Sequence, residues 1–307
     1  MFLPLRDDNP LHRIGFQFVT VALIAACTIV WVVQWLGGDQ FDAELVFRLG
    51  MIPVTVLGEL RREPDMVTIT PWLTIVTSMF LHGGFMHLFG NMLYLWIFGD
   101  NVEDAMGHWR FAIFYLLCGA VAGLTHAAVE PASQIPTIGA SGAVSGVLGA
   151  YFVLHPKRGV WILVFFMPIR FPAWGVLGLW IGYQVFNALV AGPAGGGVAW
   201  YAHIGGFAAG ALLVVPLRKR GVPLFDRGYS RRSRRRTPYQ PPPAAESPGM
   251  GPWEEPPADE IADPEADGDA PWQEPPPARP NGGDPQDRDG ARGPWGRRPR
   301  GPWSRRD

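Results

Sequence analysis

Apolar stretches that contain no Asp, Glu, Lys or Arg dominate the first two thirds of this 307-residue chain. A helix needs about 20 apolar residues to cross a hydrocarbon layer about 30 Å thick, and each stretch is long enough. The last one has room for two helices, separated by a turn in the glycine-rich segment 192–197. The pattern predicts six membrane-spanning helices, within residues 14–38, 86–104, 111–129, 131–156, 172–191 and 199–217.

Backbone polar groups cannot stay unpaired in lipid, so helices with short connections are the economical architecture for such a segment. We expect an all-α membrane protein with a six-transmembrane-helix bundle at residues 14–217, after a short N-terminal segment at 1–13. Residues 1–217 hold only 21 charged side chains, whereas a soluble domain carries about 25%. A water-soluble globule is therefore excluded. The apolar run at residues 14–36 is too long for a signal peptide, and no small-residue cleavage pattern follows it.

Residues 218–307 differ in composition, with 32 charged residues and 19 of the chain's 31 prolines. Such a segment cannot bury enough apolar surface to offset the entropy of ordering it, which predicts a disordered tail. Its first part, residues 218–236, contains nine basic residues, enough to associate with anionic lipid headgroups. A solubilising role explains the tail equally well.

Basic residues beside the predicted helix ends favour one orientation in the membrane. With the N-terminus inside, nine basic residues flank the inner helix ends and three flank the outer ends. Because cytoplasmic loops carry the excess of Lys and Arg, we expect a multi-pass protein of the cell (plasma) membrane with both termini cytoplasmic. The inner set is Arg6, Arg13, Arg110, Lys157, Arg158, Arg170, Arg218, Lys219 and Arg220, and the outer set is Arg48, Arg61 and Arg62.

The overall charge balance restricts the partners. With 26 basic against 27 acidic residues, the chain lacks the cationic excess that binding to nucleic acid requires. Cys27 and Cys118 lie in apolar runs without metal-ligand spacing, so neither a disulfide scaffold nor a metal site is expected. The expected partners are membrane lipids and other membrane proteins, and the sequence does not indicate an oligomeric state.

Four polar side chains lie within the predicted spans, where such groups are costly and are often functional. His87 and Asn91 are spaced i and i+4, so both project from one helix face. Ser141 lies in a Gly-Ala-Ser-Gly sequence at the start of the fourth helix, and His203 lies on the sixth. A polar transport pathway is one interpretation of these residues. The internal repeats and paired broken helices that many transporters contain are not evident, however.

Small residues follow both Ser141 and His203 at three- and four-residue intervals, namely Gly142, Gly146, Gly206 and Gly210. Such glycines let two helix backbones approach closely, which would bring Ser141 and His203 within hydrogen-bond reach. A serine becomes a nucleophile when a histidine takes its proton. His87, Asn91 and the Ser141 backbone N–H are candidate donors to the resulting oxyanion. This chemistry requires no metal or organic cofactor, and no carboxylate is evident to orient His203.

The combined pattern resembles the rhomboid family of intramembrane serine proteases over about residues 13–217. The resembling segments, which occur in the family's order, are His82-Gly83-Gly84-Phe85-Met86-His87 with Asn91, Leu95-Trp96 with Gly99 and Glu103, Gly139-Ala140-Ser141-Gly142, and Ala202-His203-Ile204-Gly205-Gly206 with Gly210.

The resemblance implies a serine endopeptidase in which Ser141 is the nucleophile and His203 is its base and later its acid. His87 and Asn91 would line the oxyanion hole together with the Ser141 N–H. The glycines that would support the site are Gly139, Gly142, Gly206 and Gly210.

The family fold implies a six-helix bundle whose fourth helix begins below the membrane surface, beside a cavity open to external water. Residues 174–186 and 191–200 would act as substrate gate and lid. The substrates would be transmembrane helices of other membrane proteins, cut near the outer membrane face. Gly or Pro in a substrate would help, because its helix must unwind locally to expose the scissile carbonyl.

Two positions depart from the family pattern. Many rhomboids have Trp-Arg in the first outer loop, where this chain has Trp72-Leu73. Some members stack an aromatic residue on the histidine from the position that Ser145 occupies here, so His203 would be oriented by Ser145 or by water. The alternative function is a non-catalytic relative that binds or escorts membrane helices. Such a relative is expected to have lost Ser141 or His203, and both are present.

Two further polar residues receive structural interpretations. We expect His82 to make structural hydrogen bonds rather than to take part in chemistry. We expect Glu103, near the inner end of the second helix, to bind backbone donors of a loop rather than a transported ion.

Overall fold

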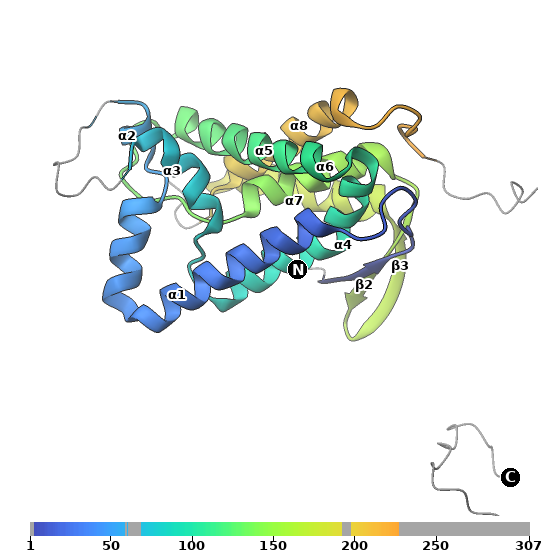
Figure 1. Ribbon diagram of the computed structural model, residues 1–307, viewed down its shortest axis with the longest axis horizontal. Helices are drawn as coiled ribbons and strands as arrows, with labels where there is room; N and C mark the ends of the chain where they lie inside the picture. The colour runs from blue at the N-terminus through green and yellow to red at the C-terminus, as the bar shows by residue number, and fades with distance from the viewer. Residues whose placement is uncertain (1–2, 59, 61–68, 192–197, 227–307) are drawn as a thin grey trace, which may run out of the picture. The chain divides into compact units, whose positions relative to one another are not determined.

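The computed structural model describes residues 3–58, 60, 69–191 and 198–226. The predicted turn at 192–197 and the tail from residue 227 onward lie outside the described residues. The helices are α1 (Phe18–Leu49), α2 (Pro53–Val56), α3 (Pro71–Thr77), the 3-10 helix η2 (Ser78–Phe80), α4 (Phe85–Met106), α5 (His108–Val129), α6 (Ser141–Leu154), α7 (Ala173–Ala191) and α8 (Trp200–Leu217) (Figure 1). The strands are β1 (Leu3–Asp7), β2 (Gly159–Val164) and β3 (Met167–Pro172).

Four helices within the described residues, α1, α5, α7 and α8, are long and apolar enough to cross a membrane. The segment α3–η2 and α4 pass the same test only as a pair bent by 84°, which gives up to five spans. Helix α6 is apolar but has only 14 residues. The expected membrane bundle is therefore confirmed as a mostly helical fold with four or five candidate spans. The full set of six spans stays a prediction.

Helix α1 continues to Leu49, past the predicted end at Gly38. Gly38 has a φ of +77°, a left-handed conformation that glycine adopts without steric cost, and the helix is kinked there. Gln34 donates to the Asp42 carboxylate across this bend at 2.6 Å. The end of the charge-free stretch thus marks a bend and not the end of the helix.

Helix α6 is buried on nearly all sides, between α4, α5 and α8. The predicted glycine contact between α6 and α8 is confirmed. A methyl group at Gly206 would fall on the carbonyl oxygen of Gly142, and one at Gly210 would fall on that of Gly146. Because no side chain separates the two backbones, the start of α6 and the His203 turn of α8 lie side by side.

A three-stranded antiparallel sheet in the order β1-β2-β3 lies at one end of the helices (Figure 1). This sheet is a departure from the expected all-α fold. The run at 159–164 is rich in β-branched and aromatic residues, which favour strands, and it is too short to span a membrane. Val160 and Ile162 are buried and attach the sheet to the helices.

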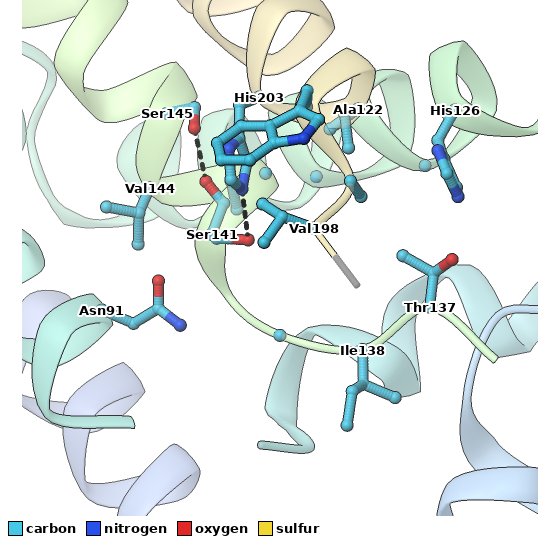
Figure 2. Close-up of a pocket in the computed structure, with 18 of the residues that line it drawn as sticks. Asn91, Ala122, His126, Thr137, Ile138, Ser141, Val144, Ser145, Val198 and His203 are labelled. Atoms are coloured by element: carbon cyan, nitrogen blue, oxygen red, sulfur yellow. Dashed lines mark hydrogen bonds between the residues drawn. The ribbon is translucent and has the colours of Figure 1, made fainter. Parts of the chain in front are cut away.

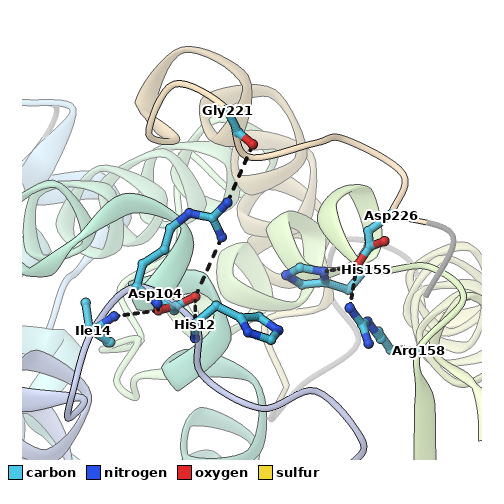
Figure 3. A network of polar contacts seen from close by, with 8 residues as sticks. His12, Ile14, Asp104, His155, Arg158, Gly221 and Asp226 are labelled. Carbon is cyan, nitrogen blue, oxygen red and sulfur yellow. Dashed lines mark hydrogen bonds and ion pairs between the residues drawn. The ribbon is translucent and has the colours of Figure 1, made fainter. Parts of the chain in front are cut away.

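Two acidic residues at the end of α4 hold the N-terminal segment. Glu103 accepts hydrogen bonds from the Val19 and Thr20 N–H groups at 3.0 and 2.8 Å, which confirms its interpretation as a ligand of backbone donors. Asp104 accepts from the Ile14 N–H at 2.8 Å, beside the start of α1 (Figure 3). These bonds satisfy backbone donors that have no intrahelical partner.

Residues 218–226, which we expected to belong to the tail, pack against the helices. The Lys219 N–H donates to the Ala105 carbonyl at 2.8 Å, and Val222 is buried. Arg158 pairs with Asp226 at 2.6 Å (Figure 3). The packed part of the chain therefore reaches at least to Asp226.

Candidate active site

Ser141 is the first residue of α6, and the turn before it has a conformation that requires glycine. Gly139 has a φ of +120°, and its N–H donates to the Ser78 carbonyl at 2.9 Å. A methyl group on Gly139 would come within 2.7 Å of the His87 ring. The N–H groups in the first turn of a helix have no intrahelical partner, so the Ser141 N–H is available to a ligand.

The Ser141 hydroxyl and the His203 ring meet between α6 and α8 (Figure 2). The distance from Ser141 Oγ to His203 Nε2 is 2.9 Å, within normal hydrogen-bond range. The predicted proximity of these two side chains is thus present in the fold. It depends on the close backbone approach at Gly206 and Gly210 described above.

The other His203 nitrogen is held by Gln184 on α7. Gln184 Oε1 lies 2.9 Å from His203 Nδ1, and Gln184 Nε2 donates to the Trp180 carbonyl at 3.4 Å. That second bond fixes the amide so that its oxygen faces the imidazole. An amide oxygen only accepts, so Nδ1 carries the proton of the neutral ring. Nε2 is then the acceptor for the Ser141 hydroxyl, which is the tautomer that a general base requires.

Ser145 is one of the two groups, with water, that we expected to orient His203, and its hydroxyl makes no hydrogen bond to that ring among the described residues. Its hydroxyl donates to the Ser141 carbonyl one turn back in α6, at 2.6 Å, as serine often does within a helix. Two tryptophans pack on the imidazole, with Trp180 and Trp200 ring centroids 6.0 and 6.3 Å from that of His203. The aromatic contact that the family resemblance led us to seek on α6 is thus made from α7 and α8.

His87 and Asn91 both line the cavity in front of Ser141, as their spacing predicted. The Asn91 side chain points into this cavity (Figure 2), and its Nδ2 is buried and has no hydrogen-bond partner among the described residues. The Gly83 N–H donates to His87 Nδ1 at 3.4 Å, which leaves the ring proton on Nε2. That nitrogen lies beside Gly139, next to the nucleophile's turn.

His82 packs against His87 and stabilises the position of its ring. Its ring packs edge-on against the His87 ring at 5.2 Å, and its Nδ1 lies 3.2 Å from the Phe80 carbonyl. The side chain is buried, and Gln34 accepts from its backbone N–H at 3.1 Å. These contacts agree with the structural interpretation of His82.

The cavity has a volume of about 1250 Å³. Ser141, His203, His87 and Asn91 lie on its wall, which also includes the segment 130–139. Such a volume exceeds the roughly 300–1,000 Å³ of common ligand pockets, so it has room for a peptide segment together with water. Among the described residues, no three His, Cys, Asp or Glu side chains gather in positions suited to a metal ion.

Gln184 and Trp180 are the members of the site that our sequence analysis missed. Gln184 is only 4% exposed and lies within the charge-free stretch 171–217. The criterion that selected His87 and Asn91, a polar group at membrane depth, applies to it equally. Its role depends on a contact between α7 and α8, however, and sequence spacing does not reveal such a contact.

Comparison with known proteins gives a consistent result. Residues 70–220 match the family model described as the Rhomboid domain. The chain is 32% identical over 219 residues to Rhomboid protease GluP of Bacillus subtilis, covering 69% of this chain and 38% of that protein. It is 32% identical over 148 residues to Rhomboid protein 1, mitochondrial, of Saccharomyces cerevisiae, covering 47% and 41%. The chain thus spans about two fifths of the length of these curated relatives.

Proposed function

Since the chain belongs to the rhomboid family, we propose that it is an intramembrane serine endopeptidase that cuts transmembrane helices of other membrane proteins. The observation that carries this proposal is the hydrogen-bonded series Ser141–His203–Gln184, with 2.9 Å at each contact to the imidazole. A nucleophile, a base and a group that orients the base are the parts that covalent acyl transfer requires.

In the proposed mechanism, Ser141 Oγ attacks the scissile carbonyl carbon while His203 Nε2 takes the hydroxyl proton. The carbonyl oxygen becomes an oxyanion, for which the Ser141 N–H, His87 Nε2–H and Asn91 Nδ2–H are donors. The unpaired Asn91 amide supports this role, because a donor without a partner in the resting protein is free for the transition state. Collapse breaks the C–N bond, and His203 passes its proton to the departing amine.

The resulting ester on Ser141 is hydrolysed by reversal of the same steps. Water attacks the ester carbonyl, His203 Nε2 takes the water proton, and Ser141 leaves with that proton as a hydroxyl again. The reaction therefore needs water beside Ser141, and the cavity supplies a space for it. No step uses a group outside this chain, its substrate and water.

We assign Gln184 as the positioning residue for His203. A serine-protease triad uses a buried carboxylate here, which holds the tautomer and stabilises the imidazolium. A neutral amide holds the same tautomer without placing a charge within the apolar helix α7, where an unpaired carboxylate would be costly. The Trp180 carbonyl fixes the amide, so α7 contributes to catalysis through both residues.

We further propose that the sheet end of the helices faces the cytoplasm and that substrates are cut near the outer membrane face. Support comes from the sequence, in which nine basic residues flank the predicted inner helix ends and three flank the predicted outer ends, and the sheet contains Arg6 and Arg170 of the inner set. Helix α6 runs from Ser141 toward the sheet end, so its N-terminus lies on the opposite side. A plasma-membrane location fits this orientation, while one similar relative is mitochondrial.

The proposal is tested by assaying the purified protein in detergent with a model transmembrane substrate. We compare the parent with Ser141→Ala and His203→Ala, and expect each variant to lose at least about 10³-fold in kcat. Ser78→Ala is a matched control, because Ser78 lines the same cavity from η2 and its hydroxyl bonds only within its own turn. Cleavage that persists in Ser141→Ala refutes the nucleophile assignment. A parent that binds transmembrane helices but never cuts them supports the escort function instead.

A further inference from the structure

The turn between β2 and β3 presents two phenylalanines to the surroundings. Phe165 and Phe166 are 91% and 93% exposed, more than any other large apolar side chain of the described residues, and Met167 beside them is 62% exposed. Exposed apolar groups that are gathered in one patch indicate an interaction surface. This patch, Phe165 to Met167, is called the hairpin tip below.

The backbone of the tip is unfavourable for these residues. Phe165 and Phe166 have φ angles of +45° and +68°. Two-residue hairpin loops of this kind favour Asn-Gly or Asp-Gly, because residues with larger side chains are strained at positive φ. The sequence thus has two bulky apolar rings where smaller polar residues would suit both the turn and water. Outliers of this kind cluster at functional positions.

The base of the hairpin adjoins a helix that is expected to face lipid. Strand β3 ends at Pro172, and α7 begins at the next residue. Trp174 and Leu179 on α7 are 56% and 64% exposed, and Phe171, near the end of β3 that adjoins α7, is 44% exposed. Figure 1 shows the hairpin at the end of the bundle with its turn directed away from the helices.

Arginine and tryptophan side chains lie at the base of the hairpin and at the start of α5. The Arg6 guanidinium lies over the Trp161 ring at 5.3 Å, and the exposed Arg170 pairs with Asp8. Trp109 at the start of α5 is 65% exposed. Tryptophan and arginine are the residues that accumulate where a bilayer meets water. Arg6 and Arg170 lie beside Asp7 and Asp8, so the base of the hairpin carries charges of both signs, and its arginines are of the type that binds anionic headgroups.

We propose that the hairpin tip inserts into the headgroup layer of the bilayer that holds the helices, while Arg6 and Arg170 contact anionic headgroups. The occupant is lipid, because the hairpin projects from the end of helices that are long and apolar enough to cross a membrane, and its exposed tip is apolar. Contact with lipid there restrains the start of α7, the helix that carries Gln184. This lipid contact is separate from the cleavage chemistry, and its test does not use cleavage.

A dye placed at the tip of the whole chain tests the proposal. Cys27 and Cys118, both buried, are replaced by Ala, and Met167→Cys is labelled with the polarity-sensitive dye NBD. The protein is reconstituted into phosphatidylcholine vesicles containing phosphatidylglycerol and a lipid with a nitroxide just below the headgroup. We expect strong nitroxide quenching at position 167. Pro10→Cys, an exposed position in the β1–α1 connection, reports the dye's own affinity for lipid and should be quenched several-fold less.

Two comparisons separate the contributions of the rings and the arginines. Replacing Phe165 and Phe166 by Ser should lower quenching at position 167 to the level at position 10. Omitting phosphatidylglycerol, or introducing Arg6→Gln with Arg170→Gln, should weaken it several-fold. The proposal is overturned if quenching at position 167 in the parent is no stronger than at position 10. It is also overturned if quenching at position 167 persists after both phenyl rings are removed. Quenching that does not depend on anionic lipid overturns the role of the arginines.

Discussion

His203 lies between two oxygen atoms that determine which of its ring nitrogens carries the proton. Ser141 Oγ and Gln184 Oε1 are each 2.9 Å from a different nitrogen of the ring. Only the amide oxygen is restricted to accepting, so Gln184 decides the tautomer. A neutral residue thus performs the orienting part of a carboxylate's role without its charge.

Gln184→Leu is expected to lower kcat by about 10- to 100-fold, below the roughly 10⁴-fold loss seen when the buried carboxylate of a serine protease is neutralised. The reason is that His203 then adopts the wrong tautomer for part of the time. KM should change little, and Gln184→Glu, which restores an acceptor oxygen, should recover part of the rate. Steady-state kinetics on a model substrate provide the measurement.

Asn187→Leu is the matched control for Gln184→Leu. Asn187 lies one turn further along α7, and its amide likewise donates to a carbonyl four residues back, at 2.7 Å, but has no contact with His203. It should keep the parent kcat. If both variants lose kcat equally, the loss comes from placing leucine in this part of α7 and not from the contact with His203. That result would contradict the positioning role of Gln184.

Asn91→Ala should lower kcat by about 10²- to 10³-fold, the usual cost of removing one oxyanion donor. The melting temperature should not fall, because the Asn91 Nδ2 is buried without a partner and its removal relieves an unsatisfied group. Both quantities are measured on one preparation. A variant that loses stability and activity together indicates a structural asparagine instead.

The polar side chains that line the cavity could largely be predicted from sequence, but the contact that orients the base could not. Ser141, His203, His87 and Asn91 stand out because polar groups are rare at membrane depth. Gln184 meets the same criterion, yet nothing in its spacing links it to a histidine on another helix. Ser145 and water were the two groups expected to orient His203, and the Ser145 hydroxyl bonds to its own helix instead.

At the level of helices, the α6–α8 contact sets the geometry of the site. Gly210→Ala is expected to separate the two helices, because its methyl group would fall on the Gly146 carbonyl. Overpacking of this kind costs about 1–3 kcal/mol of unfolding free energy, and cleavage should fall as the Ser141–His203 distance grows. Gly182→Ala on α7 is the control, since a methyl group there meets nothing within 4 Å. The measurement is the melting temperature in detergent. Equal melting temperatures for the two variants would contradict the role of the α6–α8 contact.

We expect Asp7 in the sheet to make the protein's stability depend on pH. Burial raises the pKa of Asp7 to about 6, although a hydrogen bond from the Tyr151 hydroxyl opposes the shift. The folded state therefore holds this proton more tightly than the unfolded chain. The resulting stabilisation is complete below about pH 4 and is lost as the pH rises through 6. The melting temperature should fall between pH 5 and 7, and Asp7→Asn should reduce that fall.

Asp8 provides a control of opposite sign. A hydrogen bond from Arg170 lowers the pKa of the Asp8 carboxyl, so its contribution is present at neutral pH and is lost on acidification. Asp8→Asn should therefore leave the fall between pH 5 and 7 unchanged. If Asp7→Asn behaves in the same way, Asp7 does not control the pH dependence.

The strands are the elements that the hydrophobic pattern did not predict. The length of a stretch without charged residues identifies membrane spans well, because every helix that crosses the lipid needs such a stretch. β1 and β2, by contrast, come from either side of the helical segment and pair across it. The two strands pair because the packed helices bring their ends together. Hydrophobic periodicity describes each element by itself and does not predict such a contact. The packing of residues 218–226 was missed for a similar reason, because Arg158, the partner of Asp226, lies far away in sequence.

At the scale of the whole molecule, the Ser141 end of α6 and the sheet lie at opposite ends of that helix. Ser141 begins α6 at one end, and the sheet with the hairpin tip lies at the other.

Removal of residues 227–307 should leave kcat in detergent within about twofold of the parent, because the contacts that hold the site come from residues before Asp226. Truncation before Arg218 is the contrasting variant and should destabilise the protein, because it removes Val222 and the Lys219 bond to Ala105. Abolished cleavage in the first variant would show that the tail takes part in catalysis.

The central claim is that His203 activates Ser141. Its most direct test is to treat the protein in detergent with a fluorophosphonate, which phosphonylates activated serines, and to locate the adduct by peptide mass spectrometry. The account predicts one adduct, on Ser141, that forms much more slowly in His203→Ala and at an intermediate rate in Gln184→Leu. An adduct on another residue, or equal labelling of Ser141 without His203, would contradict it.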